Sequence, residues 1–160
     1  ARHRAERNEY LEDFHRHLSS PTVRGFFAYE VPGWTPDGGL SCSIGVRIDW
    51  DKPVGLALSL CEPSSWELER ADNLPELPAG TRKLVHLYTL NHMHGTGLGQ
   101  ALYDSVIYPG ENSYLWVMAE NERALSFYER LGYRNEGVYF QARGSWEPGR
   151  SVRYTRILNP

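Results

Sequence analysis

The chain carries a glycine-dense turn, His94-Gly95-Thr96-Gly97-Leu98-Gly99-Gln100, between a strand-like segment and a helix-like segment. The first N–H groups of a helix have no partner within the helix, and the helix dipole adds partial positive charge there. Glycine lets an anion come close to these amides, because a Cβ would hold it away. The turn therefore predicts a phosphate site, and a structural turn without a ligand is the alternative.

The spacing of the glycines distinguishes between the phosphate-binding motifs that this turn could represent. A dinucleotide fold has Gly-x-Gly-x-x-Gly, but Gly99 follows Gly97 one residue too early for that pattern. A P-loop has a lysine directly after its last glycine, and Gln100 stands there instead. Both motifs are disfavoured.

A second segment that could take part in chemistry is residues 121–133. Asn121 is a typical helix N-cap, and Gly132 is typical of a helix end. Tyr128 lies on the apolar face of this predicted helix. A buried tyrosine needs a partner for its hydroxyl, and a thiol or thiolate could be that partner. Packing without any chemical role is the alternative.

The two segments together resemble the GNAT superfamily of acetyl-CoA-dependent N-acetyltransferases. The turn resembles the motif Gln/Arg-x-x-Gly-x-Gly/Ala, with His94 at the Gln/Arg position as the one departure. Residues 121–133 resemble Asn-x-x-Ala-x-x-Phe-Tyr-x-Lys/Arg-Leu-Gly-Phe/Tyr. Two motifs in this order are more specific than either alone, and the resemblance covers residues 83–140.

The resemblance implies direct attack of an amine of a small molecule or peptide on the thioester of acetyl-CoA. It implies that the main chain near Leu87 faces the oxyanion, that Thr89 pairs with the pantetheine arm, and that Asn121 hydrogen-bonds the pantetheine region. Tyr128 would protonate the leaving thiolate, because the reference pKa of tyrosine, about 10, is near that of a thiol. The expected cofactor-binding residues are Leu87, Thr89, His94, Gly95, Gly97, Leu98, Gly99, Gln100 and Asn121.

The base that takes a proton from the amine is less evident. Many GNAT enzymes use a glutamate on the central strand, and residues 83–90 contain no acid. His86 on that strand is a candidate general base, with a histidine satisfied within the sheet as the alternative. Glu120 or a chain of water molecules are other candidates. The missing glutamate also motivates a different class of function, a non-catalytic sensor that binds CoA.

The connection over residues 61–77 is rich in acidic residues, which would suit a cationic amine such as a polyamine. A solvated loop without this role is the alternative. The acids are Glu62, Glu67, Glu69, Asp72 and Glu76.

The elements around these motifs predict an α/β fold in one domain, residues 1–160. The chain opens directly into a predicted helix, and either the domain begins there or an N-terminal strand precedes it outside this sequence. We expect a mixed, mostly antiparallel sheet flanked by helices, with the splayed central strand pair that the resemblance implies. A bulge in the central strand would produce that splay. The predicted helices are residues 5–18, the segment after Gly97, and the segment after Asn121. The predicted strands are 23–31, 43–49 paired as a hairpin with 54–60, 83–90, 113–118, 133–140 and 151–158, and residues 61–80 are predicted to be irregular.

Composition indicates an ordinary globular chain, with 160 residues, 41% hydrophobic and 23% charged residues. The formal net charge of −3 predicts no nucleic-acid partner. No apolar run approaches the ~20 residues of a membrane span, and no secretory signal is evident. Two cysteines, Cys42 and Cys61, predict reduced thiols and a cytoplasmic protein. We expect no metal site, and a homodimer is one expected assembly.

Overall fold

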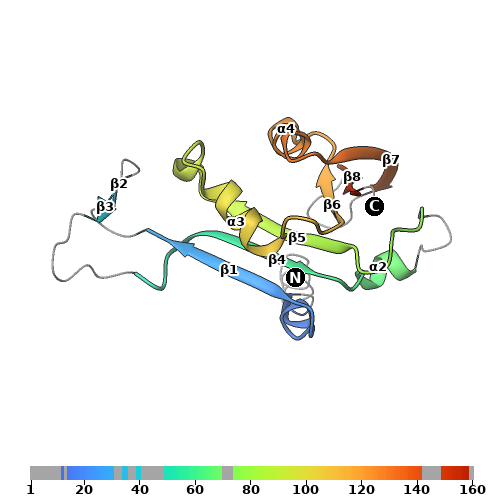
Figure 1. The fold of residues 1–160 in the computed structure, drawn as a ribbon, viewed down its shortest axis with the longest axis horizontal. Coiled ribbons are helices and arrows are strands. Elements are labelled where there is room, and N and C mark those ends of the chain that lie inside the picture. Colours follow the sequence, from blue (N-terminus) through green and yellow to red (C-terminus); the bar gives the residue numbers. More distant parts are fainter. Residues whose placement is uncertain are drawn as a thin grey trace, which may run out of the picture.

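The computed structural model describes residues 12, 14–30, 34–35, 39–40, 49–69, 74–141 and 149–158. Six strands form one sheet in the order β1-β4-β5-β6-β8-β7 (Figure 1). The pair β2 and β3 forms a small separate ladder. The strands are β1 (Arg24–Tyr29), β2 (Trp34–Thr35), β3 (Gly39–Leu40), β4 (Pro53–Leu60), β5 (Arg82–Thr89), β6 (Ser113–Met118), β7 (Arg134–Gln141) and β8 (Arg150–Arg156).

All neighbours in the large sheet run antiparallel except β5 and β6, which run parallel. The helices are α2 (Ser65–Leu68), the short 3₁₀ helix η2 (Asn91–Met93), α3 (Leu98–Val106) and α4 (Glu122–Arg130). The predicted mixed, mostly antiparallel sheet flanked by helices is confirmed.

The centre of the sheet opens where β5 and β6 diverge. These two strands pair only from Arg82 opposite Ser113 to Leu84 opposite Leu115, although both continue beyond that point. On its other side, β5 has a register shift against β4. Leu58 pairs with His86 and the next residue, Ser59, pairs with Leu84, so Val85 is an extra residue in β5. A bulge bends its strand and increases the local twist, so it turns β5 away from β6 at this position. The predicted splayed pair is present.

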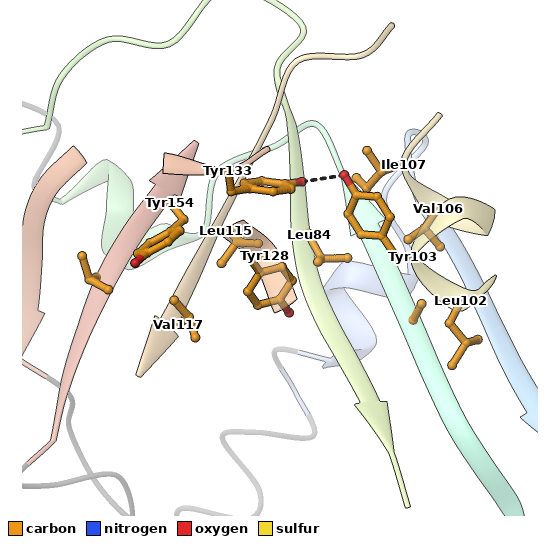
Figure 2. Packing of buried hydrophobic residues seen from close by; sticks show 12 residues of the cluster. Leu84, Leu102, Tyr103, Val106, Ile107, Leu115, Val117, Tyr128, Tyr133 and Tyr154 are labelled. Carbon is orange, nitrogen blue, oxygen red and sulfur yellow. Dashed lines mark hydrogen bonds between the residues drawn. The ribbon is translucent and has the colours of Figure 1, made fainter. Parts of the chain in front are cut away.

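The core lies between the sheet and the helices α3 and α4. Helix α3 packs across β1, β4 and β5. The core contains four buried tyrosines with hydroxyl groups that need partners, and two of them, Tyr103 and Tyr133, bond each other at 3.1 Å (Figure 2). The Tyr133 hydroxyl also lies 2.6 Å from the buried Ser113 hydroxyl at the start of β6. These contacts join α3, β6 and the segment after α4 below the opening.

Several sequence predictions need revision. Strand β4 has β1 and β5 as its two neighbours. The predicted hairpin partner, residues 43–49, falls outside the described residues except for Asp49, which is not in a strand. The connection 61–80, predicted to be irregular, contains the helix α2. Its four residues are too short for a periodic pattern, and a capping box between Ser64 and Glu67 starts it.

The N-terminal helix predicted over residues 5–18 lies mostly outside the described residues, but 14–18 are helical. This segment (blue in Figure 1) lies across the sheet from α3. Side chains on β5 therefore have two different environments. Leu84 and Leu87 pack into the core with α3, whereas His86 faces Phe14 and His17.

Candidate functional site

A cavity of about 670 Å³ lies between the end of β5 and helix α4. Its walls come from three elements that are far apart in the sequence: the end of β5, the turn before α3, and one face of α4. Most predicted cofactor-binding residues line it. These are Leu87, Thr89, His94, Gly95, Gly97, Gly99, Gln100 and Asn121, and Tyr128 lines it as well.

The glycine turn forms an open cradle of main-chain amides. Gly95 and Gly97 have φ angles of 82° and 87°, a region that favours glycine. A Cβ built on either would meet no atom within 4 Å, so the space beside them is free for a ligand. Among the described residues, no hydrogen bond is recorded from the N–H groups of Gly95, Gly97, Gly99 or Gln100. Amides without partners at a helix start are suited to bind phosphate.

The main chain of β5 presents further polar groups to the cavity. The N–H of Leu90 bonds Val54 O at 2.9 Å on the β4 side. In an antiparallel pair the bonding residues alternate, so Leu87 and Thr89 direct their main-chain groups to the other side. There β6 has diverged and offers no strand partner. An extended ligand could bond these groups as an added strand does.

Tyr128 is buried on α4, and its hydroxyl points away from the Tyr103–Tyr133 pair toward the diverging ends of β5 and β6 (Figure 2). No hydrogen bond of this hydroxyl is recorded within the described residues. Burial, followed by the nearby Tyr88 and Tyr103, raises the pKa of Tyr128 well above 10. The phenol therefore keeps its proton across the ordinary pH range and can donate it to a group in the cavity.

His86 does not line this cavity. Its side chain lies on the opposite face of β5, where its ring centre is 5.7 Å from Phe14, 6.1 Å from His17 and 5.7 Å from Tyr88. The imidazole is buried, with 9% of the residue exposed. It is therefore separated by the strand from the amide cradle, and it is one residue from Leu87, which lies on the cavity side.

Three other predicted residues differ in how they could contact a ligand. Asn121 accepts the N–H of Ala124 at 3.2 Å with its side-chain oxygen, so its amide NH₂ remains as the donor toward the cavity. Gln100 donates to Asp104 at 2.9 Å. Leu98 does not line the cavity, because its side chain packs against the core.

The acidic connection is partly used by the fold itself. Glu62 accepts hydrogen bonds from Ser20 at 2.7 Å and from Thr22 at 2.6 Å. Glu67 is buried, pairs with the buried Lys83 and accepts the indole N–H of Trp116 at 2.8 Å. These two acids are therefore not free to attract a cationic acceptor. Asp72 lies outside the described residues.

Comparison with known proteins gives a family-model match and several solved structures of similar fold. Residues 71–141 match the family model described as FR47-like protein, which is GNAT-related. No curated protein sequence matches the chain at a significant level. Among solved structures, Arabidopsis thaliana NAA60 in complex with acetyl-CoA has 16% identity and a TM-score of 0.55, and the match covers 95% of this chain and 93% of that one.

Two further structures are similar over most of their length. NAA60 of Arabidopsis thaliana with a bisubstrate analogue has 18% identity and a TM-score of 0.54, covering 94% of this chain and 93% of that one. A GNAT-family protein from Desulfovibrio desulfuricans has 19% identity and a TM-score of 0.50, covering 96% and 80%. The chain has the GNAT acetyltransferase fold. The resemblance seen in the two sequence motifs is confirmed by both kinds of comparison.

Within this GNAT fold, two arginines of the cavity were missed by sequence analysis. Arg123 and Arg130 both line it from α4. They are seven residues apart, a spacing that places both on one helix face. That spacing, with Arg123 before Tyr128 and Arg130 after it in the second motif, was the signal available in the sequence. Two cations on the wall of a cavity lined by free amides make the site attractive to anions.

No helix among the described residues combines the length and apolarity that crossing a bilayer requires.

Proposed function

We propose that this protein is an acetyltransferase that moves the acetyl group of acetyl-CoA to a primary amine of a small molecule or peptide. The observation that carries this proposal is the single cavity shared by the amide cradle, the unpaired main chain of β5 and the Tyr128 hydroxyl. Phosphate binding, pantetheine binding and protonation of a thiolate each need one of these features. The GNAT fold, which NAA60 also has in its acetyl-CoA complex, supports the same reaction.

In this proposal each part of CoA meets a different element. The pyrophosphate binds the free amides of Gly95, Gly97, Gly99 and Gln100, and the pantetheine arm runs along β5 at Thr89. The Asn121 amide group bonds the same arm. The thioester carbonyl then lies at the main-chain N–H of Leu87, which stabilises the negative charge that develops on its oxygen.

The amine nitrogen attacks the thioester carbon, and collapse of the tetrahedral intermediate breaks the C–S bond. The departing thiolate takes the proton of Tyr128. Since burial raises the pKa of this phenol, full transfer to a free thiolate would be uphill, and donation is therefore concerted with C–S cleavage. The tyrosinate regains a proton after the product leaves.

The amine must lose a proton in the same cycle, and we assign His86 as the general base. The amine approaches from the face of β5 opposite α4, because the cavity on the α4 side is taken by CoA. His86 lies on that approach face, next in sequence to Leu87. Glu120 and a chain of water molecules remain the competing bases.

A turnover assay decides between an enzyme and a CoA-binding sensor. Free thiol release from acetyl-CoA is measured with a panel of peptides and small amines, and binding of acetyl-CoA and CoA is measured by calorimetry. We expect binding of both ligands and acceptor-dependent thiol release. Binding without thiol release for any acceptor would favour the sensor, and no heat of binding at millimolar ligand would overturn both.

The acceptor class is left broad in this proposal. Glu62 and Glu67 are engaged within the protein, which removes part of the charge argument for a polyamine. The panel therefore includes both peptides and small amines. The cytoplasmic location, the homodimer and the lack of a nucleic-acid partner or metal stay predictions from the sequence.

A further inference from the structure

The residue at position 94 is the point at which this chain departs from the GNAT turn motif. Glutamine or arginine is usual there, and His94 brings less positive charge to a phosphate. In the structure, the Arg123 guanidinium, from the first turn of α4, contacts Nδ1 of His94 through its Nη1. Both side chains line the cavity. A full positive charge therefore lies beside His94, but the residue that carries it is Arg123 of the second motif.

The position of Arg123 is unfavourable for the helix alone. Cations in the first turn of a helix interact unfavourably with the helix dipole. Across the part of the chain that the structure describes, no carboxylate is recorded within ion-pair distance of Arg123. The side chain is exposed, so packing does not account for its position either. A bound anion would interact favourably with the N-terminal end of the helix dipole, and it would give Arg123 the counter-charge that no recorded carboxylate provides.

We propose that Arg123 binds the pyrophosphate of CoA and replaces the side chain that position 94 lacks. The inference rests on the proposed function, because it assumes CoA in the cavity. His94 accepts the Arg123 N–H through Nδ1 and so orients the guanidinium toward the amide cradle at Gly95 and Gly97. Arginine binds phosphate oxygens with two parallel donors, which an imidazole cannot do. Arg130 lies two helical turns farther along α4, where it would contact the 3′-phosphate of CoA.

Calorimetry with CoA and with dephospho-CoA tests this assignment. Dephospho-CoA keeps the pyrophosphate and lacks the 3′-phosphate. We expect Arg123→Ala to weaken the binding of both ligands by the same factor, about tenfold or more, because one charge-assisted contact is lost in each. With acetyl-CoA as substrate, KM should rise and kcat at saturation should stay unchanged, since Arg123 is remote from the thioester.

Two further variants complete the test. Arg134→Ala removes the same charge from an exposed residue that does not line the cavity, and it should bind CoA as the wild type does. His94→Arg in the Arg123→Ala background should restore affinity to within about threefold, because position 94 reaches the same point in the cavity. Alanine is a strong helix former, so circular dichroism should show the fold retained.

Each other outcome overturns the inference in its own way. A loss with CoA but not with dephospho-CoA would move Arg123 to the 3′-phosphate. Equal affinity of Arg123→Ala and wild type would remove Arg123 from the site while leaving the proposed function intact. If Arg123→Ala loses affinity for CoA and dephospho-CoA equally but His94→Arg does not restore it, the idea that Arg123 replaces the side chain at position 94 is overturned. A wild type that binds neither ligand would overturn the proposed function itself.

Discussion

At the residue scale, Tyr128 has the environment of a proton donor that is never ionised at rest. Burial and two neighbouring tyrosines raise its pKa, and no described residue holds its hydroxyl. Loss of that hydroxyl removes the donor without removing the ring from the core.

Tyr128→Phe should therefore lower kcat by about 10²–10⁴-fold, the usual contribution of general acid catalysis, with little change in CoA affinity. Steady-state kinetics and calorimetry measure the two effects separately. An unchanged kcat would remove Tyr128 from the acid role, and a large loss of affinity would make it a binding residue.

The raised pKa of Tyr128 also has a consequence for stability. Its folded pKa lies above that of an unfolded tyrosine, so its contribution is complete below pH 10 and declines as pH rises toward the folded value. Urea unfolding between pH 8 and pH 11 should show a smaller alkaline loss in Tyr128→Phe than in the wild type. Equal losses would mean that other groups, such as Tyr133, control this range.

At the scale of single elements, the first turn of α3 combines helix formation with an open binding surface. Gly99 lies inside the helix, and a Cβ built on it would meet Phe127 at 3.9 Å, an ordinary contact. Glycine within a helix is destabilising by about 0.5–1 kcal/mol relative to alanine. The glycine is therefore unfavourable for the helix and useful for the cavity.

Gly99→Ala should raise the free energy of unfolding by up to about 1 kcal/mol and weaken CoA binding at least tenfold, because the methyl group enters the phosphate cradle. Urea denaturation and calorimetry measure the two opposite effects. A variant that is more stable and binds CoA normally would place the phosphates elsewhere. Gly97→Ala is a poor substitute, because its positive φ adds strain.

Helix α2 is held on the sheet by a buried ion pair. Burial alone would raise the pKa of Glu67, but the Lys83 charge and hydrogen bonds from Lys83, the Ser64 N–H and Trp116 outweigh it and hold this pKa below its usual value. A lowered folded pKa means that the stability from this group is present at neutral pH. It is lost as pH falls, because the unfolded carboxyl takes up its proton first.

Glu67→Gln should cost about 3 kcal/mol at pH 7, because it leaves the Lys83 ammonium buried without a counter-charge. The loss should shrink in acid, where the wild type loses the same interaction. Chemical denaturation at pH 7 and pH 4 compares the two proteins, and Glu67→Leu with Lys83→Met is the control that removes both charges. A cost independent of pH would assign the effect to packing.

At the scale of the whole molecule, the cavity is built from three separate elements, so a ligand that binds it links them. Binding only to the folded state adds about 2.7 kcal/mol of stability at a ligand concentration of 100 times Kd. For a chain of this size, that should raise Tm by about 5–10 °C. A thermal melt with and without CoA measures it, and an unchanged Tm at saturating ligand would contradict binding to the folded protein.

The sequence by itself determined the elements whose signals are local. Turn glycines and an N-cap residue are read within a few positions of the chain, so α3, α4, β5 and β6 and the two GNAT motifs were predictable. Most of the predicted cofactor residues lie in the cavity for the same reason, since they sit at the ends of those elements. The four-residue helix α2 was missed because no period can be read in so short a segment.

Only the tertiary structure decided which faces meet. It placed His86 behind β5 and away from the cavity, put Leu98 in the core, and joined Glu67 to Lys83 across 16 positions of the chain. It also brought Arg123 to His94, although 29 positions separate them. Strand pairing, the bulge at Val85 and helix packing set these contacts, and they depend on residues distant in sequence. The charge at the phosphate cradle is therefore a property of the assembled sheet and helices.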